Sequence, residues 1–344
     1  MTTIGFDLCV IWEMPVKGYG VSKQKMGRKS MSVEKNGETP LREPTDFGDG
    51  VYHSSLVNVT NVCNLDCSHC FVFRADNPNN ARDKMDDRTM LHQLEVLRDK
   101  HDIRSMLFMG GEPMIRKDLV MNAAKLFDNP LIVTNGTYGI PSLPGGLVTV
   151  SLDGPEEAND AMRGAGVFQK VKAAIAERDR DDGTTLMLQM TVTKINAHTV
   201  AEFVETVKDW SIDGVAFTFY IPIVDDQTGL AWDSLEDRDE AIRDVIAVKQ
   251  AYPDLVKAQI PVLEMMFADV CQKHTGDLGG QCVNIDILPL YMGENGAFER
   301  PECCYGNEAD CFRCGSYSLF NTVYHREVLQ QKDYVRRTLN KAVG

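Results

Sequence analysis

The sequence predicts an α/β protein whose parallel strands curl into a partial (β/α)6 barrel, TIM-like in architecture. From about residue 53, short apolar runs typical of buried strands alternate with longer segments of helical spacing, through six such units. Strands that are connected through helices pair in parallel, and right-handed crossovers curl the sheet. A chain of 344 residues is long enough for one such domain and a small appendage.

The six strands are expected where β-rich apolar runs end in turn residues. They span residues 54–60, 105–109, 131–134, 147–152, 186–192 and 214–222. Helices are expected where apolar side chains recur every three or four residues, at 88–99, 117–127, 166–178, 197–210 and 237–251. In α/β barrels the chemistry lies at the carboxyl ends of the strands, so residues that follow each strand are the first candidates for a site.

Four parts of the chain follow from this pattern. Residues 1–50 form an N-terminal extension, which either caps the active site or is a disordered terminus. Residues 51–260 form the barrel, residues 261–320 a small cysteine-rich domain, and residues 321–344 a C-terminal helix.

Composition narrows the class of protein. The net charge of −14 argues against a nucleic-acid backbone as the main partner. We expect no membrane span and no signal peptide, because no apolar run is long enough, and therefore a cytoplasmic location. Ten cysteines in such a chain indicate metal or redox chemistry rather than disulfides.

Three cysteines follow the first strand at the spacing C-x3-C-x2-C, as Cys63, Cys67 and Cys70. A structural zinc site would require four protein ligands. A [4Fe–4S] cluster that is held by three thiolates keeps one iron open, and an open iron can bind a substrate or a cofactor.

This stretch resembles the cluster motif of the radical S-adenosylmethionine (radical SAM) enzymes, in which the residue before the third cysteine is usually aromatic and here is His69. The resemblance implies a [4Fe–4S] cluster whose open iron chelates the amino and carboxylate groups of SAM. It also implies reductive cleavage of SAM to a 5′-deoxyadenosyl radical, hydrogen abstraction from a substrate, and an electron donor such as flavodoxin or ferredoxin.

Two further motifs carry the resemblance. The second strand ends in Gly110-Gly111-Glu112-Pro113, where a glutamate can accept hydrogen bonds from an ammonium group; in the family this motif holds the amino group of SAM. The fourth strand gives S-L-D-G-P from Ser151, followed by Arg163-Gly164, which resembles the signature of the branch that includes peptide maturases and cofactor-biosynthesis enzymes. The resemblance implies that Ser151 contacts SAM and that Arg163 meets its carboxylate.

Asn135, at the end of the third strand, and Gln189, on the fifth strand, are additional inward-facing candidates for contacts with the SAM ribose or the substrate, although a role other than ligand binding is favoured for both. For Asn135 a role as a turn residue is the favoured interpretation. Asp153, which precedes Gly154, is likewise interpreted as a turn former. No catalytic residue beyond the cofactor-binding set is identified.

The C-terminal cysteines form a second group. Cys282 precedes a predicted hairpin with strands from 285 to 291 and from 297 to 300 around an Asn-Gly turn, and the remaining cysteines follow it as Cys303, Cys304, Cys311 and Cys314. This order resembles the auxiliary-cluster module of many radical SAM enzymes, in its short ("twitch") rather than its long ("SPASM") form. It implies a second [4Fe–4S] cluster for electron transfer on Cys282, Cys303 or Cys304, Cys311 and Cys314; the alternative is a structural zinc site. Cys9 and Cys271 are interpreted as ordinary buried cysteines.

The favoured function is modification of a small molecule, a sugar- or nucleoside-like natural-product intermediate, by a radical SAM enzyme. The alternatives are maturation of a ribosomally made peptide, transfer of the adenosyl radical to a lipid, and a non-catalytic Fe–S or zinc protein. The moderate chain length favours modification of a small molecule, and the S-L-D-G-P signature also fits maturation of a peptide.

Overall fold

The computed structural model describes residues 41–73, 83, 85–275, 287–293, 295–300 and 308–327. Its centre is one sheet with the strand order β6-β5-β4-β3-β2-β1-β7-β8. The first six strands are parallel: β1 (Ser54–Asn58), β2 (Ser105–Met109), β3 (Asn129–Thr134), β4 (Leu147–Ser151), β5 (Thr185–Val192) and β6 (Gly214–Phe219). The predicted partial barrel is confirmed, and its sheet is not closed.

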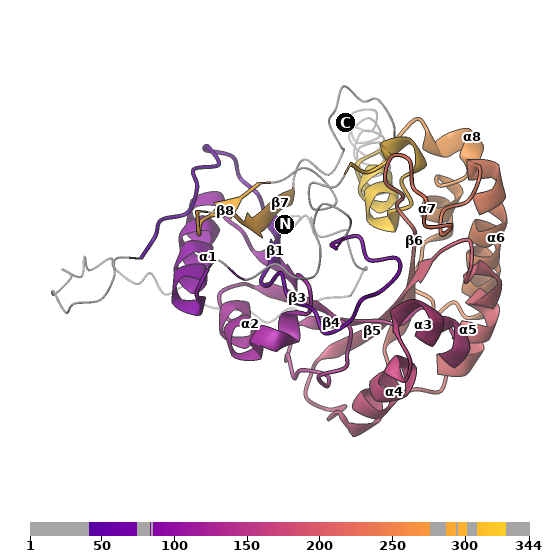
Figure 1. Cartoon of the computed structure of the whole chain (residues 1–344), viewed down its shortest axis with the longest axis horizontal. Coiled ribbons are helices and arrows are strands. Elements are labelled where there is room, and N and C mark those ends of the chain that lie inside the picture. The colour runs from indigo at the N-terminus through magenta and orange to yellow at the C-terminus, as the bar shows by residue number, and fades with distance from the viewer. Residues whose placement is uncertain are drawn as a thin grey trace, which may run out of the picture.

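The helices are α1 (Asp87–His101), α2 (Lys117–Ala124), α3 (Glu156–Arg163), α4 (Val167–Glu177), α5 (Val200–Val207), α6 (Leu235–Ala251), α7 (Ile260–Glu264) and α8 (Ala268–Cys271). Helices α1 to α5 lie between these strands in the chain, helices α6 to α8 follow β6, and most of them lie along the outer side of the curved sheet (Figure 1). Side-chain caps start the longest two, since Asp86 accepts from the Thr89 N–H and Ser234 from the Asp237 N–H.

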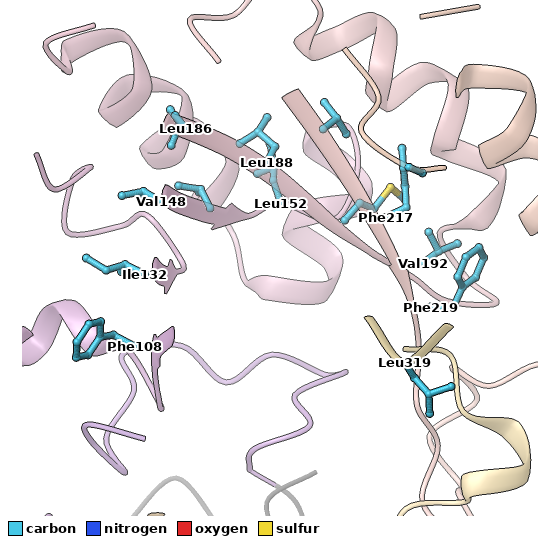
Figure 2. Packing of buried hydrophobic residues seen from close by; sticks show 14 of the residues in the cluster. Phe108, Ile132, Val148, Leu152, Leu186, Leu188, Val192, Phe217, Phe219 and Leu319 are labelled. Atoms are coloured by element: carbon cyan, nitrogen blue, oxygen red, sulfur yellow. The ribbon is translucent and has the colours of Figure 1, made fainter. Parts of the chain in front are cut away.

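The two faces of the sheet differ because side chains alternate along each strand. Toward the helices project fully buried side chains such as Phe108, Ile132, Val148 and Leu188 (Figure 2). The opposite, concave face carries a smaller apolar cluster, formed by Leu107, Leu131, Leu147 and Met187. Beyond that cluster, toward the carboxyl ends of the strands, the side chains on the concave face are polar. Most of these polar side chains are half-buried.

Three parts of the observed structure differ from the prediction. The segment after β4 forms the helix α3, although its sequence was interpreted only as a motif. The predicted helix over 197–210 is a 3-10 turn, Ala197–Thr199, followed by α5, which ends at Val207. Further helical structure begins at residue 317, before the predicted C-terminal helix.

The predicted hairpin is present as β7 (Ile287–Met292) and β8 (Phe298–Glu299), which pair antiparallel. Its docking position was not predicted from the sequence. β7 pairs in parallel with β1, and the Ser55 hydroxyl donates to the Leu288 carbonyl at 2.6 Å. The hairpin therefore covers the open edge of the barrel sheet that β1 would otherwise expose.

No helix within the described ranges is both long enough and apolar enough to span a membrane.

Candidate active site

The loop after β1 carries the three motif cysteines, each partly exposed. Backbone N–H groups face two of the sulfurs: Leu65 N lies 3.5 Å from Cys63 Sγ, and Phe73 N lies 3.3 Å from Cys70 Sγ. The Cys70 N–H also donates to the Cys67 carbonyl at 3.1 Å, which tightens the turn between the second and third cysteines.

Two glycines at the end of β2 allow this loop to lie directly against the sheet. The Gly111 N–H donates to the Thr60 carbonyl at 2.8 Å, and the Glu112 N–H donates to the Val62 carbonyl at 2.9 Å. A Cβ atom on Gly111 would lie 2.1 Å from the Val62 carbonyl oxygen, and one on Gly110 would lie 2.6 Å from the Thr60 carbonyl oxygen. Any side chain at either position would displace the loop that leads into Cys63.

The Glu112 carboxylate is buried and links the ends of β2 and β3. It accepts hydrogen bonds from Met114 N at 2.9 Å, from the Thr134 hydroxyl at 2.7 Å and from Asn135 N at 2.7 Å. Burial raises the pKa of this carboxyl group, and the three donors oppose that shift. Glu112 thus holds its neighbours in place, a task that the motif itself did not reveal.

Asn135, at the end of β3, is both a turn residue and a contact of the cysteine loop. Its Oδ1 atom accepts from the N–H and the hydroxyl of Thr137, as the sequence interpretation expected. Its Nδ2 atom donates to Asn64 Oδ1 at 2.9 Å and lies 4.0 Å from Cys63 Sγ.

Arg163 reaches the same loop from the last turn of α3. Its Nη1 atom lies 3.9 Å from Cys67 Sγ, and its Nε atom lies 2.5 Å from Oδ2 of Asp153. The same carboxylate oxygen lies 3.0 Å from Nε2 of His69, and all three side chains are buried. The charges of Arg163 and His69 hold the pKa of Asp153 well below its usual range, although burial alone would raise it.

Sequence reasoning missed this ionic network, because Asp153 was interpreted as a turn former. Asp153 does precede Gly154, but its side chain also accepts from the Thr191 N–H at 2.8 Å. A signal was present in the sequence, since an acid, an arginine and a histidine all fall within predicted motifs, but only the fold brings them together.

The charge state that these sulfurs favour depends on what they bind. Burial raises the pKa of Cys63, and it raises that of Cys67 to about 12, with Arg163 acting against the shift at Cys67. Thiols of this kind remain protonated until a metal takes them as thiolates. The N–H donors and the guanidinium that face the sulfurs suit that thiolate state, so the residues fit an iron–sulfur cluster.

Within the described part of the chain, no three His, Cys, Asp or Glu side chains are grouped as ligands of a single metal ion. An iron–sulfur cluster needs no such group, because each thiolate binds a different iron.

Ser151 and Gln189 lie side by side in the register of β4 and β5, half-buried on the concave face. Next to them on that face is Thr149, which is fully buried and whose hydroxyl has no hydrogen-bond partner among the described residues. Ser151 and Gln189 are therefore accessible to a ligand on this face, whereas the Thr149 hydroxyl is buried beneath it.

Of the C-terminal cysteines, Cys311 is exposed and Cys314 is buried. Their turn contains a 3-10 helix, Cys311–Arg313, and lies along the chain that follows β6: Val224 N donates to the Glu308 carbonyl, and Phe219 N donates to the Gly315 carbonyl, both at 2.8 Å. Cys282, Cys303 and Cys304 lie outside the described residues, as does Cys9. Cys271 is buried, as expected.

Comparison with known proteins agrees with this arrangement. The family model described as "Radical SAM superfamily" matches residues 57–236. The pre-heme d1 synthase of Dinoroseobacter shibae is 30% identical over 169 residues, which cover 45% of this chain and 40% of that protein. The sporulation killing factor maturation protein SkfB of Bacillus subtilis is 25% identical over 162 residues, 44% of this chain and 38% of SkfB. The match thus spans less than half the length of either curated relative.

Among solved structures, Streptococcus suis SuiB bound to S-adenosylmethionine superposes with a TM-score of 0.53 at 15% identity, over 78% of this chain and 72% of that chain. This similarity establishes the shared fold. Since the family model covers more than half of the sequence, the chain belongs to the radical SAM superfamily, whose members are enzymes that use a [4Fe–4S] cluster and S-adenosylmethionine.

Proposed function

We propose that Cys63, Cys67 and Cys70 hold the catalytic [4Fe–4S] cluster and that SAM binds beside it at the carboxyl ends of the strands. One observation carries this proposal: side chains from the ends of separate strands converge on one cysteine loop. Asn135, after β3, lies 4.0 Å from Cys63 Sγ, and Arg163, beyond β4, lies 3.9 Å from Cys67 Sγ. A surface loop that binds nothing would not be expected to receive such contacts from two separate strand ends.

The groups assigned to SAM are Gly110, Gly111, Glu112, Asn135, Ser151, Arg163 and Gln189. When bound, the reduced cluster and SAM supply a 5′-deoxyadenosyl radical that takes a hydrogen atom from the substrate. The protein's part is to fix the cysteine loop through the glycine contacts, to keep Asn135 in place through Glu112, and to anchor Arg163 through Asp153.

The assignment for Arg163 needs a refinement. Its Nε atom already pairs with Asp153, so a SAM carboxylate would be met by the terminal nitrogens. These same nitrogens lie near Cys67 and His69, which places the guanidinium between the cysteine loop and the end of β4. For Glu112, the three protein donors already take up both carboxylate oxygens, so its contact with an ammonium group would use a remaining lone pair.

We propose a small-molecule substrate of neutral, hydroxyl-bearing character. The support is the concave face of β1–β6, where the side chains that alternate with the buried outer ones carry no charge. The polar members toward the carboxyl ends are Asn58, Thr149, Ser151, Gln189, Thr191 and Thr218. Hydroxyl and amide groups recognise hydroxyls and amides, whereas a carboxylate- or phosphate-rich substrate would call for Arg or Lys on this face.

Peptide maturation is the second candidate. It is favoured by the S-L-D-G-P segment at Ser151 and by the similarity to SkfB, whose name describes it as a maturation protein. The similarity to the pre-heme d1 synthase supports small-molecule chemistry to a comparable degree.

The cofactor assignment is tested on the full chain under anaerobic conditions. Reconstituted protein is incubated with SAM and dithionite, iron is counted, and 5′-deoxyadenosine is measured. Replacing Cys63, Cys67 and Cys70 with Ala should remove about four irons and all SAM cleavage, whereas the matched control Cys9→Ala should change neither. SAM cleavage that survives the triple replacement would overturn the assignment.

The substrate class is tested by stimulation of SAM cleavage. The loaded enzyme receives a low-molecular-weight extract of the host cells, with or without prior protease treatment. Stimulation that resists protease supports a small molecule, and stimulation that protease abolishes supports a peptide. Chemical reduction by dithionite in both arms removes any dependence on the physiological electron donor, for which a flavodoxin or ferredoxin is the proposed class.

A further inference from the structure

The three motif cysteines face different kinds of partner. Backbone N–H groups lie near two of the sulfurs, at 3.5 Å from Cys63 Sγ and at 3.3 Å from Cys70 Sγ. The sulfur of Cys67 faces a full positive charge, because Nη1 of Arg163 lies 3.9 Å from it. A peptide N–H carries only a partial charge. Of these three contacts, the one with Arg163 therefore brings the largest charge to the cysteine loop.

The guanidinium is anchored on two sides. Arg163 is the last residue of α3, and its side chain is 8% exposed. The Ser68 N–H, next to Cys67, donates to the Met162 carbonyl at 3.0 Å, so the cysteine loop is joined to the last turn of α3 beside the charge. On the other side, Nε of Arg163 pairs with the carboxylate of Asp153.

Asp153 is itself fixed by the surrounding backbone. Its side chain is completely buried and accepts from the Thr191 N–H at 2.8 Å. Its carbonyl accepts from Asn196 Nδ2 at 2.9 Å, and its N–H donates to Asn159 Oδ1 at 3.0 Å. The ion pair therefore has a set orientation, with a terminal nitrogen of the guanidinium toward the cysteine loop and Nε toward the carboxylate.

A fixed charge beside a thiolate-held cluster shifts its reduction potential, because reduction adds one negative charge. A cation favours the reduced state and raises the potential, whereas an anion lowers it. The same balance acts on the Cys67 thiol: burial raises its pKa to about 12, Arg163 opposes that shift, and Asp153 adds to it more weakly. At Cys67 the effect of the cation exceeds that of its counter-ion.

We propose that Arg163 raises the reduction potential of the cluster on the three motif cysteines and that Asp153 moderates this effect. The inference rests on the proposed function, and it gives the ion pair a redox role in addition to a contact with SAM. Burial makes the effect large, since water and salt screen a surface charge far more than a buried one. A higher potential eases transfer of one electron from the donor protein or from dithionite.

The test is a redox titration of the full reconstituted chain without SAM, followed by electron paramagnetic resonance. The signal to follow is the one that disappears when the three motif cysteines are replaced by Ala. Arg163→Gln removes the charge, and Arg163→Lys keeps it. The matched control is Arg178→Gln, because Arg178 is 5% exposed and also faces an aspartate, Asp213 at 3.8 Å, but beside the start of β6.

Arg163→Gln should lower the potential. At a fixed solution potential, the ratio of reduced to oxidised cluster should fall about ten-fold or more, and ten-fold corresponds to about 59 mV for a one-electron couple. Arg163→Lys should retain most of the wild-type ratio, and Arg178→Gln should retain all of it. Equal potentials in wild type and Arg163→Gln would overturn the proposal, and so would an equal decrease in Arg163→Lys, since the charge would then not be the cause.

The moderating role of Asp153 is tested by Asp153→Asn, which should raise the potential. His69 also contacts this carboxylate, so the comparison is made in a His69→Gln background, where no imidazole charge changes with the substitution. An unchanged or lower potential would refute the moderating role. If Arg163→Gln alone assembles no cluster, the double variant with Asp153→Asn replaces it, and a potential equal to that of wild type would overturn the role of Arg163.

Failure of this inference and failure of the proposed function give different results. An unmodified chain that assembles no cluster on the three motif cysteines overturns both. A cluster of about four irons whose potential does not respond to Arg163 overturns only the redox role.

Discussion

Asp153→Asn is the most informative single substitution in the candidate site. The change keeps the size of the side chain and removes its charge. The carboxylate is completely buried and faces Arg163 Nε at 2.5 Å and His69 Nε2 at 3.0 Å through the same oxygen. An asparagine could keep the hydrogen bond from the Thr191 N–H, but it would leave the buried guanidinium without an anion.

The magnitude follows from the burial of both partners. Removing one member of a buried ion pair costs about 3–5 kcal/mol, because the remaining charge is left uncompensated. The whole free energy of unfolding of a protein is about 5–15 kcal/mol, so this loss is a large fraction of it. An exposed pair behaves differently because water screens it.

Urea unfolding of the metal-free protein, followed by circular dichroism, measures this loss directly. The matched control is Asp233→Asn, which breaks the exposed pair with Lys194 and should leave the unfolding midpoint unchanged. If Asp153→Asn destabilises the protein no more than the control does, the ion pair does not stabilise the fold as argued. The double variant Asp153→Asn with Arg163→Gln should be less destabilised than Asp153→Asn alone, since it no longer leaves the Arg163 guanidinium buried without an anion.

The other contacts of the site give four more expectations. Gly111→Ala should prevent cluster assembly, measured as iron content after reconstitution, because its Cβ would lie 2.1 Å from the Val62 carbonyl oxygen; normal iron content would contradict the docking of the cysteine loop. Glu112→Ala leaves three donors without their acceptor and should lower the free energy of unfolding by about 3 kcal/mol in urea titrations, and an unchanged midpoint would argue against its structural role. Thr149→Val should leave the melting temperature equal or higher, since it removes a buried hydroxyl without a partner, and a clear decrease would mean that the hydroxyl is bonded. The lowered pKa of Asp153 means that the ionised carboxylate stabilises the protein fully above about pH 4 and less as the pH falls further, so the difference in unfolding free energy between wild type and Asp153→Asn, measured in urea titrations, should narrow in acid.

Much of the site was visible in the sequence because cofactor chemistry restricts residue type and spacing over short stretches. The C-x3-C-x2-C spacing, the glycine pair before Glu112 and the serine of S-L-D-G-P each occupy one loop or strand end. The strands were predictable for a similar reason, since strands of a parallel sheet read as short continuous apolar runs. All six predicted strands begin or end at a residue that the structure confirms as a strand boundary, among them Ser105–Met109 at both ends.

Contacts between distant segments were not predictable in the same way. The docking of β7 against β1 joins Ser55 to Leu288, and nothing local in either strand specifies the partner or the register. The role of Asp153 was missed for the same reason. It is a charged residue in an ordinary local context, and its partners His69 and Thr191 come from distant segments of the chain.

The sequence by itself determined the family, the parallel α/β architecture and the identity of the cysteines, because each of these depends on short-range spacing and periodicity. The tertiary structure alone decided which side chains meet. It placed Glu112 between two strand ends and Asp153 between Arg163 and His69. The physical reason is burial: a charge has an unambiguous partner only when folding removes water from around it, and the positions from which water is excluded are a property of the assembled fold.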